Sequence, residues 1–188
     1  MGVPRRQVVL AGLAAGLGTV LLGRAAVAGM APPGGAAMVR IERFSVYGLS
    51  MATVELPLLV RSEAQWRAQL PALAYAVTRR GASEPAFSGR YLHNRQPGVY
   101  RCICCDTALF ATDSQFDDGS GWLSFRQPIS RYNVAESLGP DGNPNRLEVC
   151  CRRCQAHLGG VSADGPPPSH LHYRIDSVAL HFIASPPY

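Results

Sequence analysis

Two pairs of cysteines constrain this chain more than any other feature of its sequence. Each pair has the spacing Cys-x-x-Cys, and the same 49 positions separate Cys102 from Cys151 and Cys105 from Cys154. Two such pairs can supply four thiolates to one tetrahedral ion, and Zn²⁺ binds a thiolate sulfur at about 2.3 Å. The spacing therefore predicts a structural zinc site that joins two distant parts of the chain.

Other roles for the cysteines stay open at this point. The same four could form two disulfide bonds in an oxidising compartment. A redox role for either pair is disfavoured, because neither pair lies in an obvious thioredoxin-like strand–helix unit. Cys104 and Cys150 lie outside the predicted ligand set, and each is next to a ligand. The sequence is compatible with a disulfide between these two, with spare ligands and with inert thiols.

The first 28 residues have the composition of an export signal. Arg5 and Arg6 precede an apolar run of 15 residues, Val8 to Leu22, and a small-residue sequence ends at Ala28. This pattern predicts twin-arginine export, a periplasmic or exported location, and cleavage after Ala28. The apolar run is too short to span a bilayer comfortably, so only an uncleaved signal would hold the protein at a membrane.

The chain divides into three parts: the export signal at residues 1–28, a linker and extended hairpin at residues 29–60, and a domain at residues 61–188. The formal net charge is +5, but three arginines lie in the predicted signal, which contains no acidic residue. The mature chain is therefore close to neutral. A nucleic-acid partner is not expected, because such partners require a basic face. The sequence indicates no particular oligomeric state.

The pattern of apolar residues predicts a mainly β domain with a short helical region near its start. Alternation within residues 39–60 predicts a hairpin. Ser62 is a candidate N-cap, and Gln65 completes a capping box. Helical spacing over residues 62–79 is interrupted at Pro71. Further strands are expected at residues 129–134, at residues 146–150, and as one final strand at residues 171–182.

Several motifs occur in the order found in one known family. They are Tyr100-x-Cys102-x-x-Cys105, Phe116-Asp117-x-Gly119-x-Gly121-Trp122-x-Ser124-Phe125, Glu148-Val149-x-Cys151-x-x-Cys154, Ala156-His157-Leu158-Gly159 and Asp164-Gly165-Pro166. With these motifs, residues 60–183 resemble the type B methionine-R-sulfoxide reductases. The resemblance implies two packed antiparallel sheets, and a four-cysteine zinc site that lies far from the active site.

The resemblance also implies a reaction for which this chain lacks the nucleophile. In the family, a thiolate on the last strand attacks the sulfur of peptidyl methionine-R-sulfoxide, methionine leaves, and a sulfenic acid forms. The family pattern Arg-Tyr-Cys-Ile-Asn-Ser corresponds here to residues 172–177, so Arg174 occupies the position of the nucleophile. A guanidinium is a permanent cation without a usable lone pair, and it cannot perform this attack.

Other positions of the implied substrate pocket are partly changed. Gly160 replaces a histidine of the family pattern, His172 replaces an arginine, and Asp176 replaces an asparagine. The usual resolving cysteine is Ser120, although many members lack that cysteine. The residues expected to line the pocket are Trp122, Phe125, His157, Asp164, His172 and Asp176.

A buried arginine needs an anionic partner, so Arg174 is expected to pair with Asp176 or Asp164; the alternative is that it points to solvent. The other histidines, His93, His170 and His181, are expected to be surface or partly buried residues without a metal role. Because the family's metal lies away from its pocket, neither Cys104 nor Cys150 is expected to reach a substrate.

These observations predict an exported zinc-containing domain that has become a pseudoenzyme. It would bind a peptide that contains methionine or methionine sulfoxide, or a partner protein, through the Trp122 pocket. The alternative is a working reductase that repairs oxidised methionine in exported proteins, with Cys104 or Cys150 as an unusual nucleophile. A third reading is a new activity, with His157, Asp164 or His172 as acid–base groups.

Overall fold

The computed structural model describes residues 37–187. The predicted export signal at residues 1–28, its cleavage point and most of the linker lie outside the described residues. Within residues 37–187, no helix has the length and apolar character that crossing a membrane requires.

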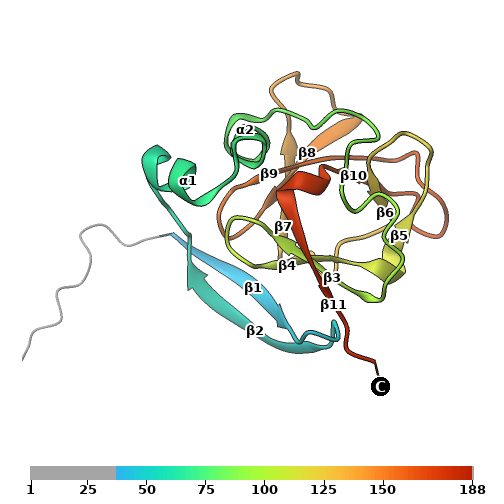
Figure 1. Ribbon diagram of the computed structural model, residues 1–188, viewed down its shortest axis with the longest axis horizontal. Helices are drawn as coiled ribbons and strands as arrows, with labels where there is room; N and C mark the ends of the chain where they lie inside the picture. Colours follow the sequence, from blue (N-terminus) through green and yellow to red (C-terminus); the bar gives the residue numbers. More distant parts are fainter. Residues whose placement is uncertain (1–36, 188) are drawn as a thin grey trace, which may run out of the picture. The chain divides into compact units, whose positions relative to one another are not determined.

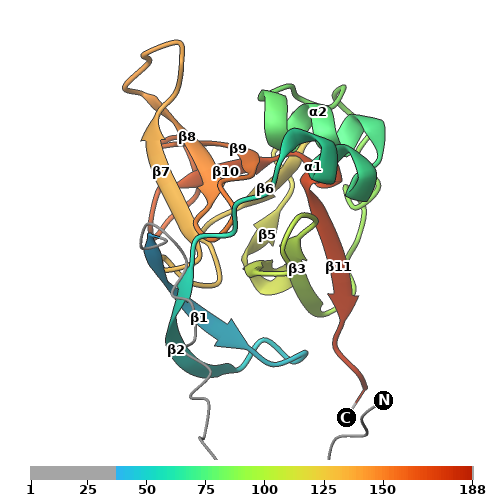
Figure 2. The same cartoon turned by 90° about the vertical axis from the view of Figure 1, so that its left-hand side faces the viewer.

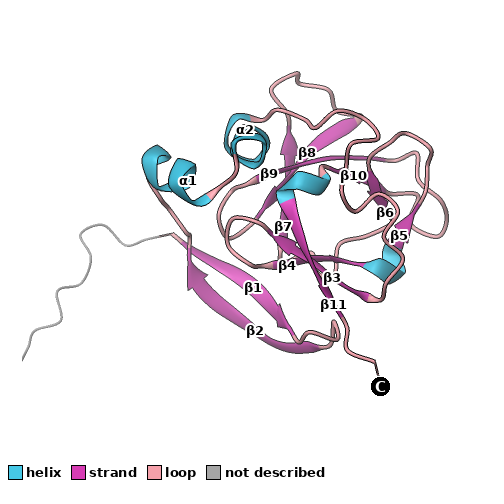
Figure 3. Ribbon diagram, viewed as in Figure 1, coloured by secondary structure: helices cyan, strands magenta, loops and turns pink. Residues whose placement is uncertain are grey.

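Strands dominate the described chain and form antiparallel sheets (Figure 3). The largest has six strands in the order β5-β6-β10-β9-β8-β7, and a second has three in the order β11-β3-β4. The six strands are β5 (Gln115–Phe116), β6 (Leu123–Phe125), β7 (Val134–Leu138), β8 (Arg146–Cys151), β9 (His157–Ser162) and β10 (His172–Ile175). The three strands are β3 (Gly98–Cys102), β4 (Ala108–Ala111) and β11 (Leu180–Ala184). The predicted mainly β fold with two antiparallel sheets is confirmed.

The two sheets pack together through buried aromatic rings. Phe110 of β4 stacks on Phe125 of β6 with ring centroids 4.5 Å apart, and Tyr100 of β3 meets Phe125 edge-on at 5.3 Å. Tyr173 of β10 lies 5.8 Å from Phe110. Each such ring buries about 150–250 Å² of surface. The expectation that Phe125 lines the pocket is therefore wrong, because its ring lies in this core with no exposed surface.

The predicted helical region is present as two short helices, α1 (Glu63–Gln69) and α2 (Ala72–Arg80). Ser62 and Gln65 form the predicted capping box at the start of α1. Pro71 separates the helices, because proline cannot donate the backbone hydrogen bond that would continue α1. Gly81 ends α2 in the left-handed conformation, with φ of 67°.

The expected single strand at residues 171–182 is instead two strands in different sheets, β10 and β11, separated by the 3₁₀ turn η2 (Ser177–Ala179). The buried carboxylate of Glu84 causes this break. It accepts the backbone N–H of Ser177 at 2.6 Å and that of Val178 at 3.0 Å, so neither group can join a sheet ladder.

The expected strand at residues 129–134 is also wrong, because this segment turns and β7 begins only at Val134. The turn contains the backbone hydrogen bond from Asn133 N–H to Ser130 O at 3.1 Å. A second 3₁₀ turn, η1 (Thr112–Ser114), lies between β4 and β5.

The predicted N-terminal hairpin is confirmed as β1 (Met38–Phe44) and β2 (Ser50–Pro57), which pair antiparallel (Figures 1 and 2). Asn133 attaches it to the domain. Its fully buried amide accepts the N–H of Glu42 and donates to the carbonyl oxygens of Glu42 and Ala108, each at 2.8 Å. One side chain thus replaces a strand partner for β1 and ties the hairpin to β4.

We expect Asn133→Ala to lower the free energy of unfolding by about 2–4 kcal/mol, because buried backbone groups of Glu42 and Ala108 would lose their partner. Urea denaturation measures this change. The control is Asn143→Ala, which changes an exposed turn asparagine and should cost under about 1 kcal/mol. Equal costs for the two variants would show that Asn133 does not hold the hairpin.

Candidate functional site

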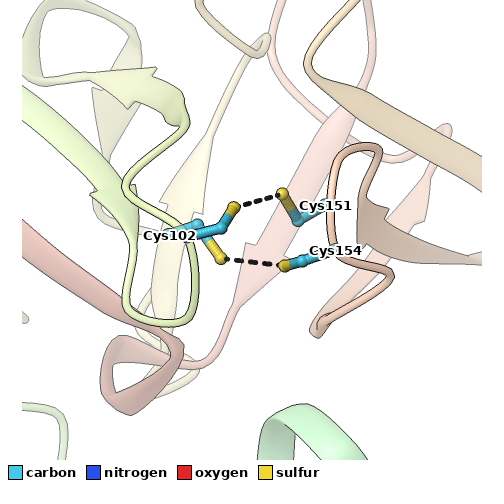
Figure 4. A group of neighbouring side chains, drawn as sticks. Cys102, Cys151 and Cys154 are labelled. Carbon is cyan, nitrogen blue, oxygen red and sulfur yellow. Dashed lines mark hydrogen bonds between the residues drawn. The ribbon is translucent and has the colours of Figure 1, made fainter. Parts of the chain in front are cut away.

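The four paired cysteines converge on one point (Figure 4). The sulfur atoms of Cys102 and Cys154 are 3.6 Å apart, and those of Cys105 and Cys151 are 3.5 Å apart. All four sulfurs lie within 4.8 Å of one another. Thiolates about 2.3 Å from a shared tetrahedral ion would have similar separations. The donor set therefore fits one metal ion.

Both pairs are positioned by the same backbone turn. The backbone carbonyl oxygen of Cys102 accepts the N–H of Asp106 at 2.9 Å, and that of Cys151 accepts the N–H of Gln155 at 2.8 Å. Asp106 and Gln155 both have positive φ, 62° and 56°, which allows the chain to reverse and continue as a new strand.

The alternative of two disulfides does not apply to this structure, because all six cysteines are free. This result also removes a Cys104–Cys150 disulfide. Cys104 is buried and lies outside the four-sulfur group.

A separate pocket of about 450 Å³ lies over the middle of the six-stranded sheet. Four of the residues singled out from the sequence line it: Trp122, His157, Arg174 and Asp176. The register places Arg174 of β10 between Ser124 of β6 and Gly160 of β9, and Gly160 opposite Glu148 of β8. Arg174 is therefore in the centre of the sheet and at the wall of the pocket.

Arg174 pairs with Asp118, not with Asp176 or Asp164 as expected. Its Nη2 lies 3.1 Å from the Asp118 carboxylate, whereas its buried Nε has no hydrogen-bond partner among the described residues. Asp176 is instead held by the segment before the pocket: its Oδ1 accepts the hydroxyl of Ser83 at 2.7 Å and the N–H of Glu84 at 2.8 Å.

Asp118 also links Arg174 to the two remaining predicted pocket residues. His172 Nε2 lies 3.3 Å from Asp118, and His172 Nδ1 lies 3.4 Å from Asp164. We call Asp118, Asp164, His172 and Arg174 the ionic cluster. Burial tends to raise the pKa of Asp118, but hydrogen bonds from Ser120, Arg174 and Ser124 outweigh it and lower this pKa to about 2. His172 and Asp164 are therefore neighbours of the pocket rather than part of its lining.

Two contacts shape the pocket wall. Trp122 is oriented by its indole N–H, which donates to the carbonyl oxygen of Glu84 at 3.1 Å. Gly160 lies under Arg146: a Cβ at position 160 would be 2.8 Å from Arg146 Nε. Arg146 therefore occupies part of the space that a side chain at position 160 would need.

A second group of polar side chains adjoins the pocket, and the sequence reasoning missed it. His157 Nδ1 lies 2.7 Å from the Glu148 carboxylate, and both residues line the pocket. The sulfur of Cys150 lies within 4.8 Å of both donor atoms. Cys150 therefore lies beside two pocket residues without lining the pocket itself. The sequence feature that could have predicted this group is the spacing of Glu148 and Cys150, which are two residues apart on one strand and therefore share a face.

Cys150 is nevertheless a weak nucleophile in this setting. Burial raises the pKa of its thiol to about 12, and the neighbouring Glu148 carboxylate contributes to the shift. The three other histidines belong to none of the potential metal-binding groups within residues 37–187. His93 and His170 are exposed, and His181 pairs with Asp106 at 2.8 Å.

Comparison with known proteins gives a consistent match. Residues 70–184 match the family model described as the SelR domain. A peptide methionine sulfoxide reductase MsrB of Herminiimonas arsenicoxydans is 45% identical over 128 residues, which cover 68% of this chain and 93% of that protein. A peptide methionine sulfoxide reductase MsrB of Thioalkalivibrio sulfidiphilus is 49% identical over 119 residues, which cover 63% of this chain and 87% of that protein.

A human relative, methionine-R-sulfoxide reductase B2, mitochondrial, is 39% identical over 140 residues, which cover 71% of this chain and 75% of that protein. The family-model match at residues 70–184 includes both cysteine pairs and the strands that border the pocket. The chain belongs to the MsrB/SelR family.

Proposed function

We propose that this protein is an exported, zinc-containing member of its family that has lost reductase activity and binds peptides containing methionine or methionine sulfoxide. The observation that carries the proposal is Arg174 at the pocket wall, in the position that the family pattern gives to the nucleophilic cysteine. A guanidinium cannot attack the sulfoxide sulfur, and no shift of its pKa provides a suitable lone pair.

The same substitution supplies groups for binding. Arg174 has five N–H donors, of which one lies against Asp118 and the Nε is buried. A sulfoxide oxygen is a good hydrogen-bond acceptor, so the remaining N–H groups of Arg174, which lines the pocket, favour the oxidised form of methionine. Trp122, on the same pocket, offers an apolar face to the methyl group.

The metal in this proposal is Zn²⁺, held by Cys102, Cys105, Cys151 and Cys154. Four thiolates form a closed site that suits zinc and leaves no position for a substrate. Its role is therefore structural. Export rests on the twin arginines and the apolar run within residues 1–28.

A working reductase is the second candidate, and the position of Cys150 beside the pocket favours it. The Cys150 thiolate would attack the sulfoxide sulfur, release the thioether and become a sulfenic acid, which two external thiols would reduce with release of water. The raised pKa of Cys150 opposes this route.

Single-turnover assays with dithiothreitol and a methionine-R-sulfoxide peptide test the choice. We expect no reduction by the wild type above the rate without protein. Arg174→Cys should reduce the peptide at least tenfold faster than that background rate, because the new thiol would lie in the family's position. If the wild type reduces the peptide and Cys150→Ser abolishes this activity while Cys104→Ser does not, the reductase reading replaces our proposal.

Peptide binding is measured on the same samples by titration calorimetry. Trp122→Ala should weaken binding at least tenfold, since it removes the apolar wall of the pocket. Absence of both binding and turnover in the folded wild type would refute the proposed function.

Replacing a zinc ligand should destabilise the domain. We expect Cys105→Ser to lose bound zinc and to unfold at least 10 °C below the wild type, because structural zinc contributes directly to folding. Elemental analysis and thermal denaturation measure both effects. Cys104→Ser, which changes a cysteine outside the four-sulfur group, should keep its zinc. A zinc-free Cys105→Ser domain of unchanged stability would contradict this role.

The ionic cluster predicts that the free energy of unfolding depends on pH in the acid range. Because folding lowers the pKa of Asp118 from 3.8 to about 2, its carboxylate stabilises the fold above about pH 4, and this contribution is lost as pH falls toward 2. Asp118→Asn should cost about 1–2 kcal/mol at pH 7 and show a smaller further loss between pH 4 and 2. Urea denaturation across this range tests it, with the exposed Asp117→Asn as control.

A further inference from the structure

Three side chains with different ligand chemistry meet on one face of the sheet, next to the pocket. They are Glu148 and Cys150 of β8 and His157 of β9, and the strand register places Cys150 opposite His157. Their ligand atoms, a carboxylate oxygen, a thiol sulfur and an imidazole nitrogen, all lie within 4.8 Å of one another. None of the three belongs to the four-sulfur group.

This separation from the four-sulfur group follows from the strand itself. Neighbouring residues of a strand point to opposite faces, and Cys151 contributes its sulfur to the four-cysteine group while Cys150 does not. Burial agrees with this alternation: Val149 and Cys151 are buried, whereas Glu148 and Cys150 are only half-buried. The side chains of Cys150 and Cys151 therefore lie on opposite faces of the sheet.

We propose that Glu148, Cys150 and His157 form a second metal site, for a divalent ion of borderline softness such as Zn²⁺. Oxygen, sulfur and nitrogen donors bind Zn²⁺ at about 2.0–2.2, 2.3 and 2.0–2.1 Å, so two ligands in a tetrahedral shell are about 3.4–3.6 Å apart. The three ligand atoms lie within 4.8 Å of one another, and His157 Nδ1 is 2.7 Å from the Glu148 carboxylate. Side-chain adjustments of roughly 1 Å would bring all three onto one ion. A carboxylate and a thiolate together balance the charge of a divalent ion.

The site differs from the four-cysteine group in having an open position. Three protein ligands leave a fourth place in a tetrahedral shell, which water or a ligand takes. Glu148 and His157 both line the 450 Å³ pocket, so this fourth place faces the pocket. The inference goes beyond the proposed function and does not depend on peptide binding.

Positively charged side chains near the proposed site lower its expected affinity for a metal ion. Arg79 lies near Cys150, and Arg146 lies over Gly160 beside the pocket. Both cations repel a metal ion. We therefore expect the second ion to bind more weakly than the ion of the four-cysteine group, which allows the two to be loaded one after the other.

Titration of Co²⁺ into the purified zinc-loaded protein, after weakly bound ions have been removed with a chelating resin, tests the site. We expect one further ion per chain, with the absorption of tetrahedral cobalt and a thiolate-to-cobalt charge-transfer band. Elemental analysis of the same samples should show that zinc is retained, so that cobalt has not replaced it. A wild type that binds no further ion, or binds one without the thiolate band, overturns the proposal.

Two ligand variants and one control test the assignment of the ligands. Cys150→Ser should abolish the thiolate band and weaken cobalt binding at least tenfold, and Glu148→Gln should weaken binding while keeping the band. Cys104→Ser is the matched control and should behave as the wild type. A thiolate band that survives in Cys150→Ser, or that disappears in Cys104→Ser, overturns the assignment. Circular dichroism identifies any variant that fails to fold, and the wild-type count then decides alone.

Discussion

The convergence of four cysteines is the constraint on which the rest of this structure depends. Cys102 ends β3 in the three-stranded sheet, and Cys151 ends β8 in the six-stranded sheet. One ion held by all four sulfurs would join the two sheets at a single point. After the second pair the chain reverses and becomes β9, which carries His157 and Gly160. The turn at the four-cysteine group thus helps to set the position of the pocket.

The second constraint is Glu84, whose carboxylate is buried against the start of η2. By taking the N–H groups of Ser177 and Val178, it ends β10 and sends the chain into the other sheet. Its carbonyl oxygen also accepts the indole N–H of Trp122. One residue of a loop without regular structure therefore divides a strand and orients a pocket wall. Burial raises the pKa of its carboxyl, and the two backbone donors offset part of that cost.

These examples show what the sequence could predict. The metal centre was predictable because its signal is local: two identical spacings and one ligand chemistry. The helices were predictable for the same reason, since Ser62, Pro71 and Gly81 act on their own neighbours. The broken final strand was not, because Glu84 acts on Ser177 from 93 positions away. The partner of Arg174 was missed likewise, because Asp118 lies 56 positions away and only folding brings it there.

The ionic cluster explains how a cation can occupy the centre of the sheet. A buried or half-buried arginine is costly without an anion, and the Asp118 carboxylate remains ionised there because Ser120 and Ser124 also stabilise it. Gly160, under Arg146, separates Arg174 from Glu148 across the register. The pocket therefore has two chemically different sides, the N–H donors of Arg174 on one and the carboxylate of Glu148 and imidazole of His157 on the other, with the Cys150 thiol beside them. Because Trp122 borders the same pocket, its aromatic ring and both polar sides face one cavity.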